Sequence, residues 1–319
     1  MQSNTRKMGS FFEIIRSSEG MLVVGFLLMC MTFSILFPAF LTPVNILKVL
    51  KQSSSLFMLV CGQTLVLLLA GIDLAQGSAV SFFSIIGALA VLRFGTAGGM
   101  AATLLAGILY GAACGTIITR FHVQPYIVSL GMMFFLEGAT YMITQTPITG
   151  LPVSFFYLGG ARLFGINISI IVAAVVAVAL YLFVKYSVVG RSFYIVGGNE
   201  NVARLAGVHI VRAKITAWIL NGALVSLAAL MMTSRMQSGQ PYMGGGISNE
   251  ALGAAVIGGT SLAGGKGGIV QAFIGVLIMA YMINGLNLMG ISTDIKEAIC
   301  GILIIIVAWL GARKAAKEI

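Results

Sequence analysis

Residues 21–41 read MLVVGFLLMCMTFSILFPAFL and contain no charged side chain. A helix needs about 20 mostly apolar residues to cross a bilayer, so this run predicts a membrane-spanning helix. The run is too long for the apolar core of a typical signal peptide, and no cleavage site of small residues follows it. We therefore expect it to be retained as the first span of the protein.

The composition of the whole chain agrees with this interpretation. Of the 319 residues, 59% are hydrophobic and only 9% are charged. A soluble domain carries about 25% charged residues, which cover its surface. So few charges leave most of the exterior apolar, which excludes a soluble globular protein and predicts that the lipid bilayer covers the surface.

Further apolar runs of similar length fill the rest of the chain. We expect an all-α polytopic membrane protein with about ten transmembrane helices in a single domain over residues 1–319. Two of the spans are short and run into glycine-rich stretches near Gly71 and Gly259, which is typical of broken or re-entrant helices. The expected spans are 20–40, 56–72, 77–93, 99–119, 124–145, 167–185, 213–234, 248–263, 268–290 and 295–312.

The net charge of +10 is distributed unevenly along the chain. With an even number of spans and a cytoplasmic N-terminus, thirteen of the 19 basic residues lie in cytoplasmic segments and six lie outside. Basic residues gather in cytoplasmic loops, so this count predicts that both termini are cytoplasmic, and no nucleic-acid partner is needed. The six outside residues are Lys48, Lys51, Arg93, Arg162, Arg235 and Lys296.

A weak internal repeat relates the two ends of the chain. A shift of 188 residues aligns Gly71 with Gly259, and it also aligns Leu74, Ala75 and Gly77 with identical residues. This favours a parallel duplication of residues 20–119 and 213–312, although four matches in a glycine-rich chain also arise by chance.

The longest polar interruption covers residues 186–213, which the orientation places in the cytoplasm. Within it, Asn199 is suited to cap a short helix and Gly207 is suited to end one. A short helix in a cytoplasmic loop is a natural docking element for a soluble partner, although a merely solvated loop is the commoner case.

Polar residues in the spans and at their ends are candidates for a solute path. Glu137 lies well inside a span, where it serves either transport or hydrogen bonding between helices. Asp73 lies at a segment end and serves either the path or as a cap for the helix that begins near Gly77. Amides offer donors and acceptors to a neutral polyhydroxylated solute, although contacts between helices explain any single amide equally well. The path candidates are Gln63, Asp73, Glu137, Asn221, Gln240, Glu250, Asn284 and Asn287.

Catalytic and cofactor signatures are missing from the sequence. Residues 259–267, GTSLAGGKG, resemble a phosphate-binding loop, but Thr260 stands at the first glycine position and Gly267 stands where a magnesium-binding Ser or Thr is required. There is no Ser-His-Asp, paired-carboxylate or metal-ligand pattern, and the four cysteines lie in apolar stretches. We expect a protein that is not an enzyme and that has no metal or cofactor of its own.

Three groups of motifs resemble the ribose-type sugar permeases of ABC importers. They occur in the order of that family and are spread over most of the chain. The motifs are Gly71-Ile72-Asp73-Leu74 with Gly77-Ser78; Val196-Gly197-Gly198-Asn199-Glu200 with Ala203-Arg204-Leu205-Ala206-Gly207; and Ser238-Gly239-Gln240-Pro241 with residues 254–267 and Asn284-Gly285-Leu286-Asn287-Leu288-Met289-Gly290.

The resemblance implies a multi-pass permease subunit in a bacterial plasma (inner) membrane, which imports a monosaccharide or a similar small polyol. The implied partners are a cytoplasmic ABC ATPase that holds ATP and magnesium, an extracytoplasmic sugar-binding protein, and a second permease copy or a paralogue. The ATPase would dock on the loop through Gly198, Asn199, Glu200, Arg204 and Gly207.

The chain departs from the family pattern at several positions, which include Ala75-Gln76 after Leu74 and an acidic pair reduced to Ser248 and Glu250. Ala70 replaces a glycine, and Glu137 stands where the family often has arginine. The solute is therefore left open among a pentose, a hexose, an inositol-like polyol and a furanosyl signal molecule. The alternative function, an ion-coupled secondary carrier of a small neutral solute, is disfavoured because carboxylates are scarce within the spans.

Overall fold

The structure, a computed structural model, describes residues 18–317. The elements of this range are helices, as predicted, apart from one short antiparallel hairpin of β1 (Arg162–Leu163) and β2 (Ile166–Asn167). The helices are α2 (Ser18–Leu36), α3 (Pro43–Leu67), α4 (Gln76–Arg120), α5 (Pro125–Ile143), the 3-10 turn η1 (Val153–Phe155), α6 (Phe156–Gly160), α7 (Ile168–Tyr186), α8 (Val188–Gly198), α9 (Glu200–Leu205), α10 (Ile210–Met236), α11 (Ile247–Ile257), α12 (Ile269–Leu288) and α13 (Thr293–Lys317).

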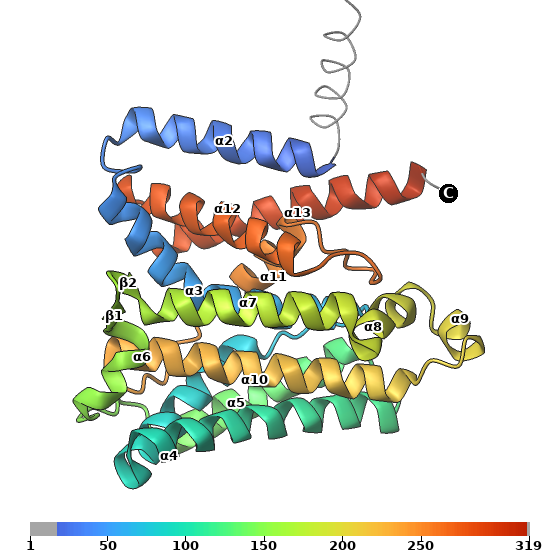
Figure 1. Cartoon of the computed structure of the whole chain (residues 1–319), viewed down its shortest axis with the longest axis horizontal. Coiled ribbons are helices and arrows are strands. Elements are labelled where there is room, and N and C mark those ends of the chain that lie inside the picture. The colour runs from blue at the N-terminus through green and yellow to red at the C-terminus, as the bar shows by residue number, and fades with distance from the viewer. Residues whose placement is uncertain (1–17, 318–319) are drawn as a thin grey trace, which may run out of the picture.

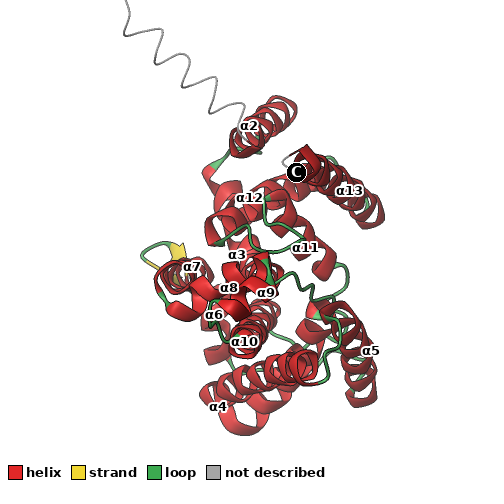
Figure 2. Cartoon of the chain, turned by 90° about the vertical axis from the view of Figure 1, so that its right-hand side faces the viewer, coloured by secondary structure: helices red, strands yellow, loops and turns green. Residues whose placement is uncertain are grey.

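The long helices run roughly along one axis, and the two ends of the molecule differ (Figure 1). α8 and α9 lie at one end, beside the start of α10, whereas the β1–β2 hairpin lies at the opposite end. Seen along this axis, α2, α12 and α13 form one side of the bundle, and α4, α5 and α10 form the other (Figure 2). α3 and α7 lie between the two sides, and α3 contacts both α10 and α12.

Six helices within the described range are long and apolar enough to cross a bilayer, judged by length and composition. They are α3, α4, α5, α7, α10 and α12. α11 has only 11 residues, which makes it about 16 Å long, roughly half the thickness of the hydrocarbon core. The prediction of a short helix in segment 248–263 is therefore confirmed.

The 45 residues of α4 form two helices and not one. A straight helix of this length would extend about 68 Å, twice the thickness of the hydrocarbon core. Gly95, at its middle, has φ 73° and ψ 176°, which is not helical. A Cβ added at Gly87 would lie 2.9 Å from Thr103 Oγ1, so residues on either side of Gly95 face each other. The two halves are antiparallel and match the expected spans 77–93 and 99–119.

α4 packs against α10 along a row of glycines. Gly107, Gly111 and Gly115 are spaced four residues apart, so they share one face of the second half of α4. A Cβ added at Gly111 would lie 2.1 Å from Trp218 O, and one added at Gly222 of α10 would lie 2.1 Å from Gly107 O. The two backbones therefore touch directly, which is typical of membrane helices that meet through small residues.

α3 is longer than the sequence predicted. The expected span begins at residue 56, whereas the helix covers Pro43–Leu67. Thr42 Oγ1 accepts a hydrogen bond from Asn45 N, and proline at the first helical position loses no hydrogen bond. The prediction of a short helix here is wrong because two lysines and a glutamine within residues 48–52 make its first half too polar to fit an apolar run.

The turns that end α3 and α11 have the same hydrogen-bond pattern. In each turn, two successive N–H groups donate to carbonyl oxygens three and five residues earlier. The pairs are Ala70–Leu67 and Gly71–Val66 after α3, and Gly259–Val256 and Thr260–Ala255 after α11. The offset between the turns is 189 residues, one more than the shift found in the sequence. The match concerns these two turns alone, and the duplication of residues 20–119 and 213–312 stays a prediction.

Replacing Gly111 with alanine should separate α4 from α10. The added Cβ meets backbone atoms of α10, which cannot rotate away as a flexible side chain would. Overpacking of this kind costs about 1–3 kcal/mol, so we expect unfolding at a lower denaturant concentration. The matched control is Gly131→Ala on α5, where an added Cβ has no atom within 4 Å. Equal stability of the two variants would contradict the direct backbone contact.

Candidate functional site

The chain doubles back into the protein interior between α3 and α4. α3 ends at Leu67, and Ala70 then adopts the left-handed conformation with φ 55°. Residues 71–75 are not helical, and α4 begins at Gln76. Gln76 Nε2 donates to Leu59 O, two turns before the end of α3, so α4 begins deep inside the protein. The predicted break in this region is therefore confirmed.

Asp73 lies in this break and is buried, with 1% of its surface exposed. Its Oδ1 accepts hydrogen bonds from Ala75 N at 2.9 Å and from Tyr110 OH at 3.0 Å. Its Oδ2 accepts from Asn221 Nδ2 at 2.6 Å and again from Tyr110 OH at 2.9 Å. Within residues 18–317, no cation pairs with this carboxylate. Its hydrogen bonds therefore come from neutral donors alone, and buried polar groups are normally satisfied in this way.

A single polar network joins the break to α4 and α10. Asn221 Oδ1 accepts from Gln76 Nε2 at 2.9 Å, so Asn221 contacts both residues that flank the start of α4. The structure thus brings together two predicted candidates, Asp73 and Asn221. Sequence reasoning missed Tyr110 and Gln76. The glycines at 107, 111 and 115 are the sequence signal that could have predicted Tyr110, because a row of small residues favours close packing of this part of α4 against another helix.

A second non-helical segment, residues 237–246, joins α10 to α11. Gly77 N donates to Ser248 Oγ at 2.7 Å, and Gly244 N donates to Ser81 Oγ at 2.9 Å. The N-terminal ends of α4 and α11 therefore meet inside the protein. Both ends present N–H groups and a partial positive charge toward the space beside them.

A cavity of about 330 Å³ lies where these two helix ends meet. Its walls offer hydroxyl and amide groups from Ser78, Ser81 and Asn249, and a carboxylate from Glu137. Among its described lining residues there is no lysine or arginine. The volume lies within the range of small-molecule sites, which is about 300–1,000 Å³.

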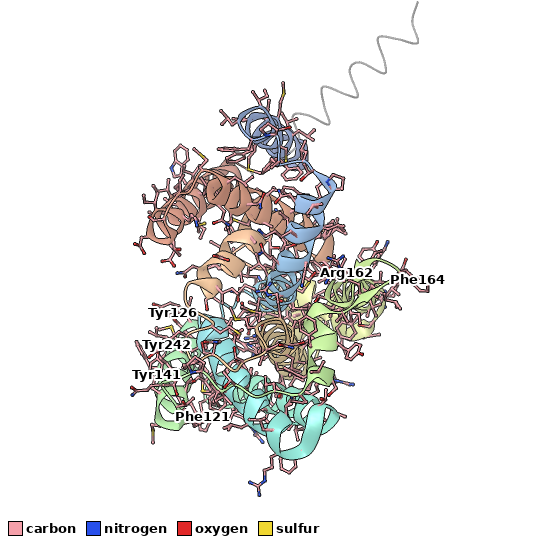
Figure 3. All side chains as sticks on the ribbon, turned by 90° about the vertical axis from the view of Figure 1, so that its left-hand side faces the viewer. Phe121, Tyr126, Tyr141, Arg162, Phe164 and Tyr242 are labelled. Carbon is pink, nitrogen blue, oxygen red and sulfur yellow. The ribbon has the colours of Figure 1, made fainter. Side chains whose placement is uncertain are left out.

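Two tyrosines form one wall of the cavity. The rings of Tyr141 on α5 and Tyr242 lie 5.3 Å apart between centroids, tilted by 40°. Tyr141 OH also donates to Glu137 Oε1 at 3.4 Å. Figure 3 shows the two tyrosines beside each other at one side of the molecule. The sequence did not indicate this pair because its members come from distant segments.

Other predicted path residues bond to groups outside the cavity lining, two of them between helices. Asn284 on α12 exchanges hydrogen bonds with Asn45 on α3, at 2.8 and 3.2 Å, which is the helix-to-helix role that the sequence left open. Asn287 accepts from Lys296 Nζ. Gln240 Nε2 donates to a neighbouring hydroxyl within residues 237–246.

Gln63 and Glu250 lie apart from the cavity lining. Both side-chain polar atoms of Gln63 are buried and have no hydrogen-bond partner. Glu250 lies on α11 within electrostatic range of Glu297 on α13. A role of any of these candidates in the path stays a prediction.

The segment 186–213 contains two helices where the sequence indicated one. Asn199 Oδ1 accepts from Asn201 N and Val202 N, so Asn199 caps α9 as predicted. Gly207, with φ 73°, ends that helix, also as predicted. Glu200 forms an ion pair with Lys214, and Arg204 is exposed. α8 was missed because residues 188–198 combine apolar residues with glycines that do not mark a helix.

α8 contacts the turn that ends α3 and the loop that follows α11. A Cβ added at Gly197 would lie 1.7 Å from Leu68 O, so α8 rests directly on the turn that ends α3. Gly265 N donates to the same Leu68 O at 3.0 Å. Tyr194 OH donates to Gly267 O at 3.0 Å, and burial raises the pKa of this phenol, which keeps it a neutral donor. The segment 186–213 is thereby connected to the turns after α3 and after α11.

Comparison with known proteins gives a consistent family. A family model described as branched-chain amino acid transport system / permease component matches residues 45–308. The ribose import permease protein RbsC of Escherichia coli K12 is 34% identical over 298 residues, covering 92% of this chain and 93% of the relative. RbsC of Bacillus subtilis is 34% identical over 299 residues, covering 92% of each chain. The D-allose transport system permease protein AlsC of Escherichia coli K12 is 31% identical, covering 83% of this chain and 82% of the relative.

These matches and the bundle of apolar helices define a multi-pass membrane permease. The chain belongs to the family of transport-system permease components that this family model describes. The resemblance to ribose-type sugar permeases is confirmed by the named relatives. No solved structure is significantly similar to the chain.

Replacing Tyr110 with phenylalanine should destabilise the protein. The change removes the donor that serves both oxygens of Asp73 and leaves a buried carboxylate with fewer hydrogen bonds. A loss of this kind costs about 1–3 kcal/mol. The matched control is Tyr126→Phe on α5, because Tyr126 is 49% exposed. Thermal unfolding of the two purified variants measures the difference, and equal midpoints would contradict the role of Tyr110.

Proposed function

We propose that this permease is the membrane-spanning subunit of an ATP-driven ABC importer that carries a monosaccharide or a similar small polyol into the cytoplasm. The observation that carries the proposal is the polar cavity where the N-terminal ends of α4 and α11 meet. Relatives that cover nine-tenths of the chain are named as ribose and L-arabinose permeases, which supports a sugar as the solute.

The lining of the cavity suits a neutral polyol. Ser78, Ser81 and Asn249 offer donors and acceptors, and the carboxylate of Glu137 accepts from hydroxyl groups. The rings of Tyr141 and Tyr242 supply apolar area for the C–H face of a sugar. An anionic solute would meet the carboxylate of Glu137 with no lysine or arginine in the described lining to offset it.

We place α8 and α9 in the cytoplasm, with about ten spans and both termini on that side. The excess of basic residues in these segments supports the orientation. The described start of α2 and the end of α13 lie at the same end of the molecule as α8 and α9 (Figure 1). The bacterial sources of the relatives support a plasma (inner) membrane location.

A second permease, either a copy or a paralogue, covers the side that carries the cavity. Glu137 is exposed on α5, which is a candidate membrane span. A carboxylate that faces lipid costs several kcal/mol, so this side faces water or protein. We place the solute path along this side, lined in part by Glu137.

Two soluble partners complete the importer. A cytoplasmic ABC ATPase docks on α8 and α9, where Leu205 is 90% exposed beside Arg204. ATP and magnesium belong to that subunit. An extracytoplasmic sugar-binding protein delivers the solute at the opposite end.

The geometry suggests how movement of the ATPase reaches the cavity. A displacement of α8 presses Gly197 against Leu68 O and, through Tyr194, moves the loop after α11. The turn after α3 leads into the break before α4, and the loop after α11 continues directly from that helix, so α8 contacts the chain next to both helices whose N-terminal ends border the cavity. Movement of α8 therefore opens the cavity alternately toward the two sides of the membrane.

Purification in mild detergent followed by reconstitution in liposomes tests the proposal. Co-purification of an ATPase and a binding protein, and uptake of ribose, allose or arabinose that requires ATP, would support it. Uptake by the permease alone, driven by an ion gradient without ATP, would favour the secondary carrier.

Arg204→Glu should uncouple transport without preventing membrane insertion. Reversing an exposed charge disturbs electrostatic complementarity at the docking surface, and we expect about a tenfold weaker association with the ATPase. Co-purification of the ATPase and ATP-dependent uptake are the measurements. The control is Arg120→Glu at the end of α4, an exposed charge outside α8 and α9. Unchanged uptake with normal ATPase recovery would refute the docking role of Arg204.

Glu137→Gln should lower uptake about tenfold, because a hydrogen bond to a charged group contributes about 1.5–3 kcal/mol and a neutral amide contributes less. The amount of inserted protein should not change, since Glu137 is exposed. The control is Asp294→Asn, an acidic residue outside the cavity lining. Reduced insertion with normal transport per molecule would show that Glu137 is structural.

A further inference from the structure

Three basic side chains converge at the end of the molecule that carries the β1–β2 hairpin. Lys51 on α3 lies within electrostatic range of Arg235, at the end of α10, and of Arg162 in β1. Among the described residues, none of the three has an ion-pair or hydrogen-bond partner. Nη1 of Arg235 is buried and unpaired, although buried polar atoms are normally satisfied. Three cations held together without an anion are complementary to an anionic group.

The hairpin beside these cations ends in an exposed apolar tip. Phe164 is 95% exposed, Leu163 is 50% exposed and Ile166 is 44% exposed. Phe164 and Gly165 have φ 50° and 83°, which form a two-residue turn with two left-handed positions. Asparagine is the favoured residue at the first of these positions, and a phenylalanine there is strained. Strain that places a large apolar side chain outside the protein indicates a contact that compensates for it.

The surroundings of the hairpin indicate lipid as this contact. α7 begins directly after β2, and the middle of this helix exposes the apolar residues Val175, Val178 and Leu182. The hairpin projects sideways from the bundle next to α7, on the side opposite α5 and α13 (Figure 2). Figure 3 shows Phe164 at the outer edge of the hairpin, with Arg162 nearer to the bundle. Aromatic tips beside basic residues are typical of the boundary between headgroups and acyl chains.

We propose that Lys51, Arg162 and Arg235 form a binding site for the phosphate headgroup of an anionic phospholipid, with Phe164 in contact with its acyl chains. The site lies in the leaflet opposite the segment 186–213. It goes beyond the proposed import function and needs neither solute nor ATPase. The lipid supplies the missing negative charge to the three cations and holds the hairpin at the membrane boundary.

Native mass spectrometry of the full chain in a neutral detergent tests the site, with phosphatidylglycerol or phosphatidylcholine added. We expect preferential retention of phosphatidylglycerol. Lys51→Gln and Arg162→Gln should each weaken retention about fivefold, the usual contribution of one basic residue near an anionic lipid surface. The matched control is Lys48→Gln, which removes an exposed lysine from the same helix outside the cluster. Equal retention of both lipids in all variants would overturn the proposal.

Thermal stability gives a second test, because the effect of Lys51→Gln on the midpoint of unfolding should change sign when lipid is added. In neutral detergent without lipid, Lys51→Gln should raise the midpoint of unfolding because it removes repulsion. With phosphatidylglycerol present, the same variant should fall below the wild type because it loses the lipid contact. A variant with the same effect under both conditions would contradict the site.

Two further arms separate other sources of negative charge. In the first arm, inorganic phosphate replaces the lipid and Phe164→Ser is tested for lipid retention. If phosphate stabilises the wild type as much as phosphatidylglycerol does, and Phe164→Ser does not change lipid retention, the site binds a free anion and the lipid proposal is wrong. In the second arm, Lys51→Gln and Arg162→Gln are compared for lipid retention and for stimulation of uptake by the sugar-binding protein. Normal lipid retention with loss of this stimulation would show that the three cations contact a protein, and the lipid proposal would be wrong.

Discussion

The hydrogen bonds that surround the carboxylate of Asp73 are the constraint on which the arrangement of helices depends. The chain leaves helical geometry at residues 71–75 inside the protein, where backbone and side-chain polar groups have no water to meet. Tyr110 and Asn221 satisfy the carboxylate only if the second half of α4 and α10 both pack against the break. The glycine row of α4 allows this approach, because any side chain there would hold α10 away.

Two interrupted regions at the centre of the bundle give the molecule its functional geometry. The helix ends that they create are joined by the hydrogen bond from Gly77 N to Ser248 Oγ and lie beside the cavity. α8 lies against the turn that precedes one break and is bonded to the loop that follows α11. A permease built this way combines rigid spans with non-helical segments whose backbone conformation can change. The turns after α3 and α11, which share one hydrogen-bond pattern, are two such segments.

Much of this organisation could be predicted from the sequence because it depends on local composition. Apolar runs indicate spans through their length, and glycines near positions 71 and 259 indicate the breaks. Asn199 and Gly207 predict the limits of α9. The start of α3 could not be found by the same means. Lys48 and Lys51 are compatible with a helix near the membrane boundary, but they interrupt the apolar run by which a span is recognised in the sequence. The wall formed by Tyr141 and Tyr242 also escaped prediction, since it exists only once α5 and the segment after α10 have folded together.

During synthesis, Asp73 leaves the ribosome 148 residues before Asn221, the donor on α10 that it meets in the folded protein. Until α10 has been made, the acidic break between α3 and α4 has no complete set of donors, and its release into lipid is unfavourable. A chain that stops before α10 would lack the Asn221 donor, so the complete hydrogen-bond set of the break between α3 and α4 requires α10 as well as α4.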